Sequence, residues 1–275
     1  MFNPFLPFYE VDPRFWPNAL VHAVLDSPSS VLTTCEVVKA PSIPEPDEYV
    51  FSAYEDLIAA RNTDAFQGAD VLLSLVSASM SCLDEARKEM SLELDDANHF
   101  QWDLYLGDQR WKLKTLGGAA VDDIPIFAFT NADYRRRFRD GARPGLAYKG
   151  PPVQDDWALD PLDLALLVAM AQGQRDNGVE QEVYTVYLLY PNLACTDVIV
   201  LTGNIPSQSL DAIREGREDM PGKIDVALGT VPIVVNADPL RENGFLKMLA
   251  ALIKYGESLA YASGDGEFVP MIRQV

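Results

Sequence analysis

The strongest constraint on the fold is a leucine-rich stretch that opens with an aspartate and a proline. Asp160 offers a side-chain acceptor to the free N–H groups of a first helical turn, and Pro161 fits the first helical position. Asp163 lies where the helix dipole favours negative charge, and Gly173 is placed to end the helix. Apolar residues at helical spacing predict one buried face: Leu162, Leu166, Leu167 and Met170.

Strand signals precede this helix. WDLYL and RWKLKTL alternate apolar and polar residues on the two sides of Gly107-Asp108-Gln109, which predicts a β-hairpin. The apolar run from Ile124 to Phe129 predicts a buried strand, and Thr130 or Asn131 can cap a short helix that follows it. Other predicted elements are a strand at 31–38, helices near 12–24 and 50–62, a segment at 69–83 that fits either period, and an acidic insertion at 84–99.

The C-terminal half contains further strand patterns. They fall at 183–190, 197–203, 223–228, 231–235 and 267–272, with helices at 207–218 and from 238 to about 253. The polar run 172–181 predicts a boundary between two domains, 1–175 and 182–275. Because strands and helices do not alternate strictly, we expect the α+β class, with a mixed or antiparallel sheet packed with helices in each domain.

The charge balance excludes some classes of partner. With 41 acidic and 22 basic residues, the net charge of −19 repels phosphate backbones and anionic membrane surfaces, so nucleic acid is not an expected partner. The longest apolar stretches fall short of the roughly 20 residues that a membrane span needs. The first residues lack the pattern of a signal peptide, which predicts a cytoplasmic protein.

A short motif resembles the hallmark of the SseB family of bacterial proteins, which is a strand, Phe-Thr-Ser and a helix that ends in an aromatic residue. Pro125, Phe127, Phe129-Thr130-Asn131 and Phe138 follow this pattern, with Asn131 in place of the usual serine or aspartate. Two residues are inserted relative to the common form, and the acidic insertion has no clear counterpart.

The resemblance extends beyond the hallmark and covers about residues 100–230. Lys149-Gly150-Pro151-Pro152 stands where the family has an Asn-Pro-Gly-like loop, and Leu159-Asp160-Pro161 matches the opening of the next helix. The segment 183–204 is similar to the opening hairpin of the family's second α+β domain. This resemblance implies a non-enzymatic accessory protein that binds another protein, and it carries over no catalytic residue.

A basic island interrupts the acidic chain, and it is the candidate partner-binding site: Arg135, Arg136, Arg137 and Arg139. An exposed patch of arginines would recognise carboxylates of a partner, because the planar guanidinium binds them bidentately. The alternative is that Tyr134 and Phe138 face the core while the arginines face water or pair with acids elsewhere in the fold.

The sequence contains no complete metal-binding or catalytic motif. Asp-Asp pairs at 95–96, 122–123 and 155–156 are interpreted as solvated loop carboxylates rather than as metal ligands, and the glycines near 117, 256 and 264 as turns or a helix end. No cofactor or metal is expected. Cys82 and His99 form the one Cys/His pair near enough in sequence to suggest a thiol-dependent hydrolase or transferase, which is the alternative function.

The leading hypothesis is a non-enzymatic interaction protein. In its sharper form it is an immunity or adaptor protein of a secretion or antagonism system, and its acidic surface binds a basic effector or toxin. Complementary charge would raise the association rate and select the partner. The sequence does not determine the oligomeric state.

Overall fold

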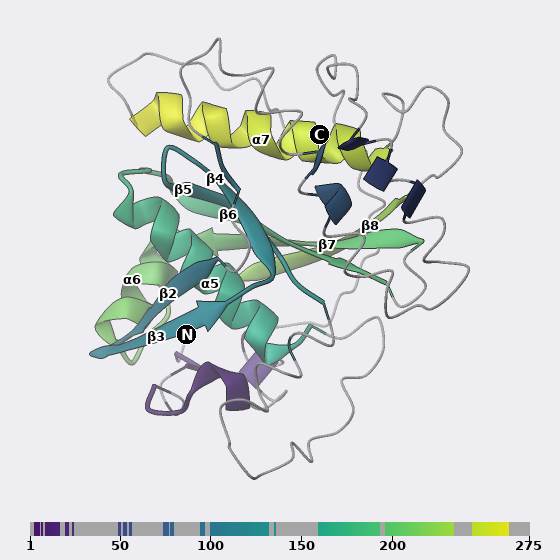
Figure 1. Ribbon diagram of the computed structural model, residues 1–275. Helices are drawn as coiled ribbons and strands as arrows, with labels where there is room; N and C mark the ends of the chain where they lie inside the picture. Colours follow the sequence, from purple (N-terminus) through teal and green to yellow (C-terminus); the bar gives the residue numbers. More distant parts are fainter. Residues whose placement is uncertain are drawn as a thin grey trace.

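A mixed sheet runs through the middle of the molecule (Figure 1). The computed structural model describes residues 3–5, 7, 9–16, 20–21, 24, 49–50, 52–53, 55–56, 74–76, 78–79, 94–96, 100–131, 135, 159–192, 196–233 and 244–263. Within them, six strands form this sheet in the order β1-β4-β5-β6-β7-β8. Their bounds are β1 (Leu94–Asp96), β4 (Gly117–Val121), β5 (Ile124–Phe129), β6 (Val183–Pro191), β7 (Asp197–Pro206) and β8 (Asp225–Pro232).

One central pair of strands is parallel, and the other pairs are antiparallel. β5 pairs in parallel with β6, so that Phe127 lies opposite Tyr187. A parallel pair needs a crossover connection, and the helix α5 (Pro161–Asp176) lies in the chain between these two strands. The α+β class is therefore confirmed, with a mixed sheet and helices on both of its faces.

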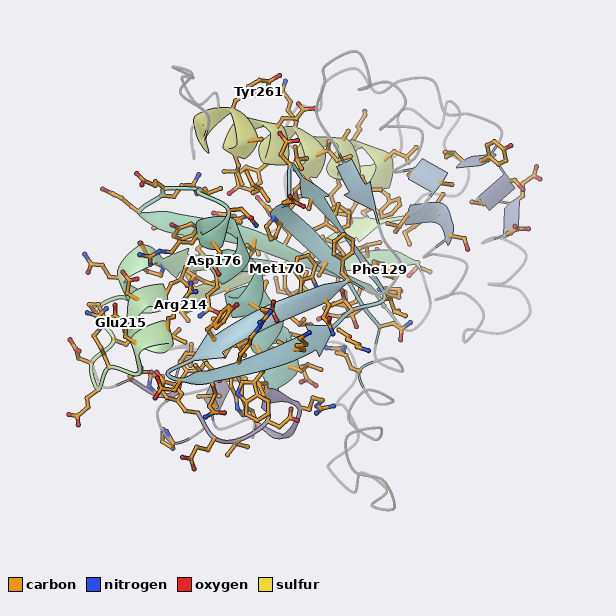
Figure 2. All side chains as sticks on the ribbon, turned by 60° about the vertical axis from the view of Figure 1, so that its left-hand side comes forward. Phe129, Met170, Asp176, Arg214, Glu215 and Tyr261 are labelled. Atoms are coloured by element: carbon orange, nitrogen blue, oxygen red, sulfur yellow. The ribbon has the colours of Figure 1, made fainter. Side chains whose placement is uncertain are left out.

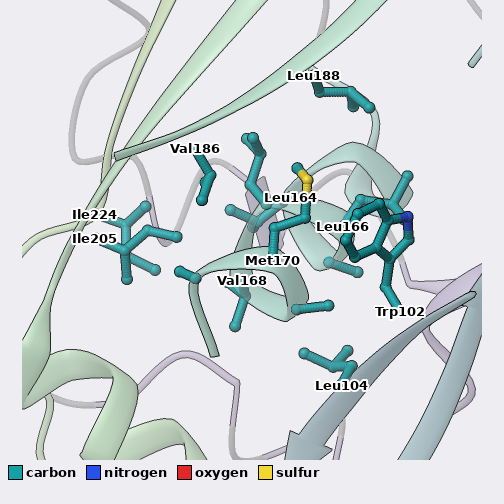
Figure 3. Packing of buried hydrophobic residues seen from close by; sticks show 14 of the residues in the cluster. Trp102, Leu104, Leu164, Leu166, Val168, Met170, Val186, Leu188, Ile205 and Ile224 are labelled. Atoms are coloured by element: carbon teal, nitrogen blue, oxygen red, sulfur yellow. The ribbon is translucent and has the colours of Figure 1, made fainter. Parts of the chain in front are cut away.

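The helix α5 is buried on all sides because it lies between two layers of strands. Every residue from Pro161 to Gln172 is buried. Trp102 and Leu104 of a β-hairpin pack on one side of α5, and Val186 and Leu188 of β6 lie on the other side (Figure 3). A helix in this position needs apolar residues around its whole circumference, which explains why its sequence is almost continuously apolar.

The hairpin consists of β2 (Gln101–Leu106) and β3 (Gln109–Lys114), which pair only with each other in the described part of the chain. This confirms the hairpin predicted from the alternating pattern. The helix α6 (Ser207–Glu215) also contacts β2, and α7 (Gly244–Ser263) covers the opposite face of the six-stranded sheet (Figure 1). A single turn of 3-10 helix, η2 (Pro13–Phe15), packs against α5.

The start of α5 agrees with the prediction, and its end does not. The Asp160 side chain accepts from Leu162 N at 2.8 Å, and Asp163 accepts from Asp160 N at 3.3 Å, which forms a reciprocal capping box. The predicted end at Gly173 is wrong, since the helix continues to Asp176. The chain then turns at Gly178, whose φ of 84° favours glycine.

The segment predicted to separate two domains lies inside one sheet assembly. Residues 172–176 are the last turn of α5, and 177–182 lead directly into β6. The strands before and after this segment, β5 and β6, are neighbours in one sheet. Gln174 links them further, because its Nε2 donates to Pro125 O at 2.7 Å and to Thr185 O at 3.2 Å. The six-stranded sheet therefore continues across the predicted domain boundary.

Other differences concern single elements. The strands predicted at 223–228 and 231–235 are one strand, β8. The glycines at 117–118 lie in β4 rather than in a turn, and Gly256 lies inside α7 rather than at a helix end. At 69–83, the described positions are helical. The strands predicted at 31–38 and 267–272 and the start of the last helix at 238–239 lie outside the described residues.

Candidate functional site

Arg135, the first residue of the predicted basic patch, lies at the carboxyl end of β5. Its backbone N–H donates to Asn131 O at 3.1 Å, and Arg135 itself has helical conformation; the rest of the predicted helix, to Phe138, lies outside the described residues. Thr130 N donates to Leu189 O at 3.0 Å, which continues the pairing of β5 with β6. This region therefore lies beside the N-terminus of α5, because α5 begins at the same end of the sheet.

The guanidinium of Arg135 is buried and forms an ion pair with Asp163 in the first turn of α5. The Arg135 side chain is 5% exposed, and that of Asp163 is 0% exposed. The guanidinium also lies 4.9 Å from the centre of the Tyr190 ring, within range of a cation–π contact. Arg135 is thus paired with an acid inside the fold and is not part of an exposed patch. Arg136, Arg137 and Arg139 lie outside the described residues.

Burial dominates the electrostatics of this pair. Desolvation raises the pKa of Asp163 from 3.8 to about 6, while attraction to Arg135 opposes the rise. Thr130 Oγ1, Arg135 Nε and Asp163 Oδ1 are buried without a hydrogen-bond partner in the described part of the chain. A group sealed in this way cannot meet a protein partner, so we assign the pair to the structure of the fold.

The opposite end of the sheet exposes carboxylates. We call it the acidic end, and it consists of five exposed side chains: Asp122, Asp123, Glu180, Glu182 and Asp225. The first two form the turn between β4 and β5, the next two precede β6, and the last begins β8. In Figure 2, Asp176 marks this end of α5, and Phe129 marks the far end of β5.

The topology brings these residues together. Parallel strands begin at the same edge of a sheet, so the turn before β5 and the segment before β6 are neighbours. A hydrogen bond from Asn177 Nδ2 to Asp123 O, at 2.8 Å, joins the two segments directly. Asn204 Nδ2 approaches Asp225 Oδ2 at 3.5 Å and places β8 at the same edge. From the sequence, Asp122-Asp123 was interpreted as a solvated pair in a loop. The residues that lie near this turn in the fold are more than 50 positions away, so no local pattern indicated them.

Both residues of the Asp122-Asp123 turn have left-handed backbone conformations, with φ of 49° and 64°. Two-residue hairpin turns of this kind favour asparagine or aspartate at the first position and glycine at the second, because most other side chains clash with their own backbone at positive φ. Asp123, at the second position, therefore carries a conformational penalty, and the turn presents both carboxylates at the tip of the sheet.

Two ion pairs join the end of α5 to α6 near the acidic end. Asp176 pairs with Arg214, and Arg175 pairs with Asp211, so these basic residues are already engaged (Figure 2). Exposed carboxylates in such a cluster attract cationic groups through long-range fields that salt screens.

Other predicted chemistry is not tested by the described residues. They contain no group of three or more His, Cys, Asp or Glu side chains that could hold a metal ion. Cys82, His99 and the Asp pair at 155–156 lie outside the described ranges. Asp95 and Asp96, expected in a loop, belong to the strand β1, which pairs with β4.

Comparisons with known proteins give no assignment. No protein-family model matches the sequence, and no curated protein matches it. The similarity to the SseB family therefore stays a prediction. Among the described helices, none is long and apolar enough to cross a membrane.

Proposed function

We propose that the protein is a non-enzymatic interaction protein whose acidic end binds a basic protein partner. The observation that supports this function is the turn Asp122-Asp123, in which two carboxylates are held at positive φ. Glycine would fit the second position of this turn at lower conformational energy than Asp123. An aspartate where glycine fits better favours a role for its charge over a role in the turn itself.

The surrounding charge supports the same conclusion. Glu180 and Glu182 extend the negative surface beside the turn, and the whole chain has a net charge of −19. Such a field accelerates the approach of a basic protein and repels acidic competitors. Exposed carboxylates at an interface act mainly on the association rate and on its salt dependence.

The proposed biological role rests on the predicted resemblance to SseB proteins. We propose a cytoplasmic immunity or adaptor protein of a bacterial secretion or antagonism system, with a basic effector or toxin as its partner. The alternative of a thiol-dependent enzyme rests on Cys82 and His99, which lie outside the described residues, so no geometry favours it.

The proposal can be tested by quantitative affinity capture from a bacterial lysate, with the wild-type chain and two double variants as bait. Asp122→Asn with Asp123→Gly removes two charges and keeps the turn. Glu55→Gln with Asp56→Asn removes two exposed charges from helical positions outside the acidic end and is the matched control.

We expect a basic protein to be captured by the wild-type chain and by the control, and to be reduced at least several-fold with the turn variant. High salt should also reduce its capture, because the attraction is electrostatic. Equal capture by both double variants would contradict a role for the acidic end, and capture of acidic proteins alone would contradict the class of partner.

A further inference from the structure

The two outer edges of the β2–β3 hairpin differ in whether their backbone groups are satisfied. Thr115 N donates to Phe100 O at 3.1 Å, which fixes the alternation of hydrogen-bonded and non-bonded pairs along the hairpin. In this register Gln109, Trp111 and Leu113 direct their backbone groups toward β2. The groups that point outward from the hairpin belong to Gln101, Asp103 and Tyr105 on β2 and to Arg110, Lys112 and Lys114 on β3.

At Tyr105, the outer edge of β2 is closed by one side chain of α5. Tyr105 N donates to Gln172 Oε1 at 2.8 Å, and Gln172 Nε2 donates to Tyr105 O at 2.9 Å. The amide of Gln172, which is 1% exposed, therefore binds Tyr105 as a neighbouring strand would. No further strand can pair with β2 at this point.

The described residues leave the outer edge of β3 without a backbone partner. In the part of the chain that the structure describes, no hydrogen bond to the outward N–H or C=O groups of Arg110, Lys112 and Lys114 is formed. Their side chains are exposed, whereas Leu113, on the other face of the strand, is buried. Arg110 pairs with Asp103 at 2.6 Å, and Lys112 and Lys114 form no ion pair with a described residue.

We propose that the β3 edge binds an extended acidic segment of another protein as an additional strand. Such a strand would satisfy the outward backbone groups, and acidic residues at every second position would lie beside the three cations. A second copy of this chain fits poorly as the occupant, because pairing β3 with itself would bring like charges together. Lysines on an exposed edge also discourage neutral strands from adding by chance.

This surface is distinct from the acidic end in both place and charge, so the inference goes beyond the proposed function. The β3 edge selects an acidic strand by charge and backbone pairing, whereas the acidic end attracts basic groups through charge alone. The two surfaces could therefore hold two different segments of one assembly at the same time.

Hydrogen exchange measured by NMR on the full chain tests the proposal at single amides. In the free protein, the amides of Lys112 and Lys114 should exchange fast, while those of Trp111 and Leu113 are protected. A short synthetic peptide in which glutamate alternates with valine and threonine should slow exchange at Lys112 and Lys114. Protection of these two amides in the free protein would overturn the proposal, since the edge would then be covered.

Two controls separate strand addition from simple charge attraction. The same peptide with N-methylated amides on its pairing edge keeps its charge but loses its donors, and it should bind far more weakly. Lys112→Glu should weaken peptide binding roughly tenfold, while Lys254→Glu, an exposed lysine of α7, should leave it unchanged. Equal binding of both peptides, or equal loss with both variants, would show that only non-specific attraction operates.

Discussion

Arg135 and Asp163 form an ion pair from which water is almost completely excluded. The pair joins the turn after β5 to the first turn of α5, and it adds a cation beside a capping box that already contains two carboxylates. Such a pair gives the N-terminus of the central helix a defined partner and a defined position.

Removal of Arg135 should destabilise the protein strongly. We expect Arg135→Met to lower the free energy of unfolding by about 3–5 kcal/mol, because Asp163 would stay buried without its cation. Arg110→Met breaks an exposed pair with Asp103 and should have a much smaller effect. Urea denaturation followed by tryptophan fluorescence compares the two variants, and equal losses would show that the buried pair contributes no more than an exposed one.

The stability contribution of Asp163 should depend on pH. Its pKa is raised from 3.8 to about 6 by burial, so between these values only the folded state holds the proton. The contribution is therefore fully present below about pH 4 and is lost as the pH rises through about 6. Arg135 and Asp160 lie beside the same carboxyl group, and Tyr190 contacts the Arg135 guanidinium. All three are unchanged in the variant Asp163→Asn, which cannot ionise.

Denaturation of the wild type and of Asp163→Asn at several pH values measures this effect. The free energy of unfolding of the wild type, minus that of the variant, should fall from about pH 4 to about pH 6 and then level off above pH 7. A difference that rises over this interval would mean that the ion pair with Arg135, and not burial, controls the titration of Asp163.

A glycine in α7 should resist substitution although it lies within a helix. A Cβ on Gly256 would overlap the Cδ1 atom of Ile126 and lie 3.1 Å from Cγ2 of Val121. Gly256→Ala should therefore destabilise the protein by about 1–3 kcal/mol, despite the higher helix propensity of alanine. Ile126→Ala in the same chain should recover part of this loss. A double-mutant cycle without such coupling would contradict the close approach of α7 to β5.

The effect of removing the charges of the Asp122-Asp123 turn on stability should depend on whether the new residues tolerate positive φ. Asp122→Asn with Asp123→Gly should raise the free energy of unfolding by about 1 kcal/mol, chiefly because glycine tolerates positive φ better than aspartate at the second position. Replacement of both aspartates by alanine removes the same charge and should lower stability, since alanine is strained there. Thermal denaturation distinguishes the two pairs, and an equal gain from both would point to charge repulsion instead of turn conformation.

Gln172 should control the attachment of the hairpin to α5. Gln172→Leu preserves much of the side-chain volume but leaves Tyr105 N–H and C=O without their partner. We expect a loss of about 1–3 kcal/mol and faster hydrogen exchange at the Tyr105 amide, while exchange in β6 and β7 changes little. Uniform acceleration across both sheets would show that the hairpin does not separate from the rest of the molecule.

Local patterns predicted local structure well. The capping residue Asp160, the proline after it and the alternating residues on the two sides of Gly107 act over a few positions, and the helix and the hairpin form there as expected. The predicted end of α5 at Gly173 was wrong because the role of this glycine depends on Pro125, which is distant in the sequence. A Cβ there would lie 2.9 Å from Cγ of Pro125, so the glycine permits close packing and does not end the helix.

The sequence patterns did not predict which distant strands pair with each other. The parallel contact of β5 with β6 joins segments on the two sides of α5, and the loop composition at 172–181 suggested a boundary instead. The same contact creates the acidic end, which explains why Asp122 and Glu180 were not predicted to be neighbours. Arg135 was expected in a patch because its partner, Asp163, is 28 positions away and looked like a residue of the helix cap alone.

Because the β2–β3 hairpin and the six-stranded sheet are separate sheets, the hairpin can unfold on its own. The hairpin shares no strand pairing with the six-stranded sheet in the described residues, so it can detach from α5 while every ladder of that sheet remains intact. The hairpin would then be a cooperative unit with its own, lower opening free energy. A strand added to β3 would have to be released before that unit unfolds, and a bound partner would thereby slow the exposure of the apolar helix behind it.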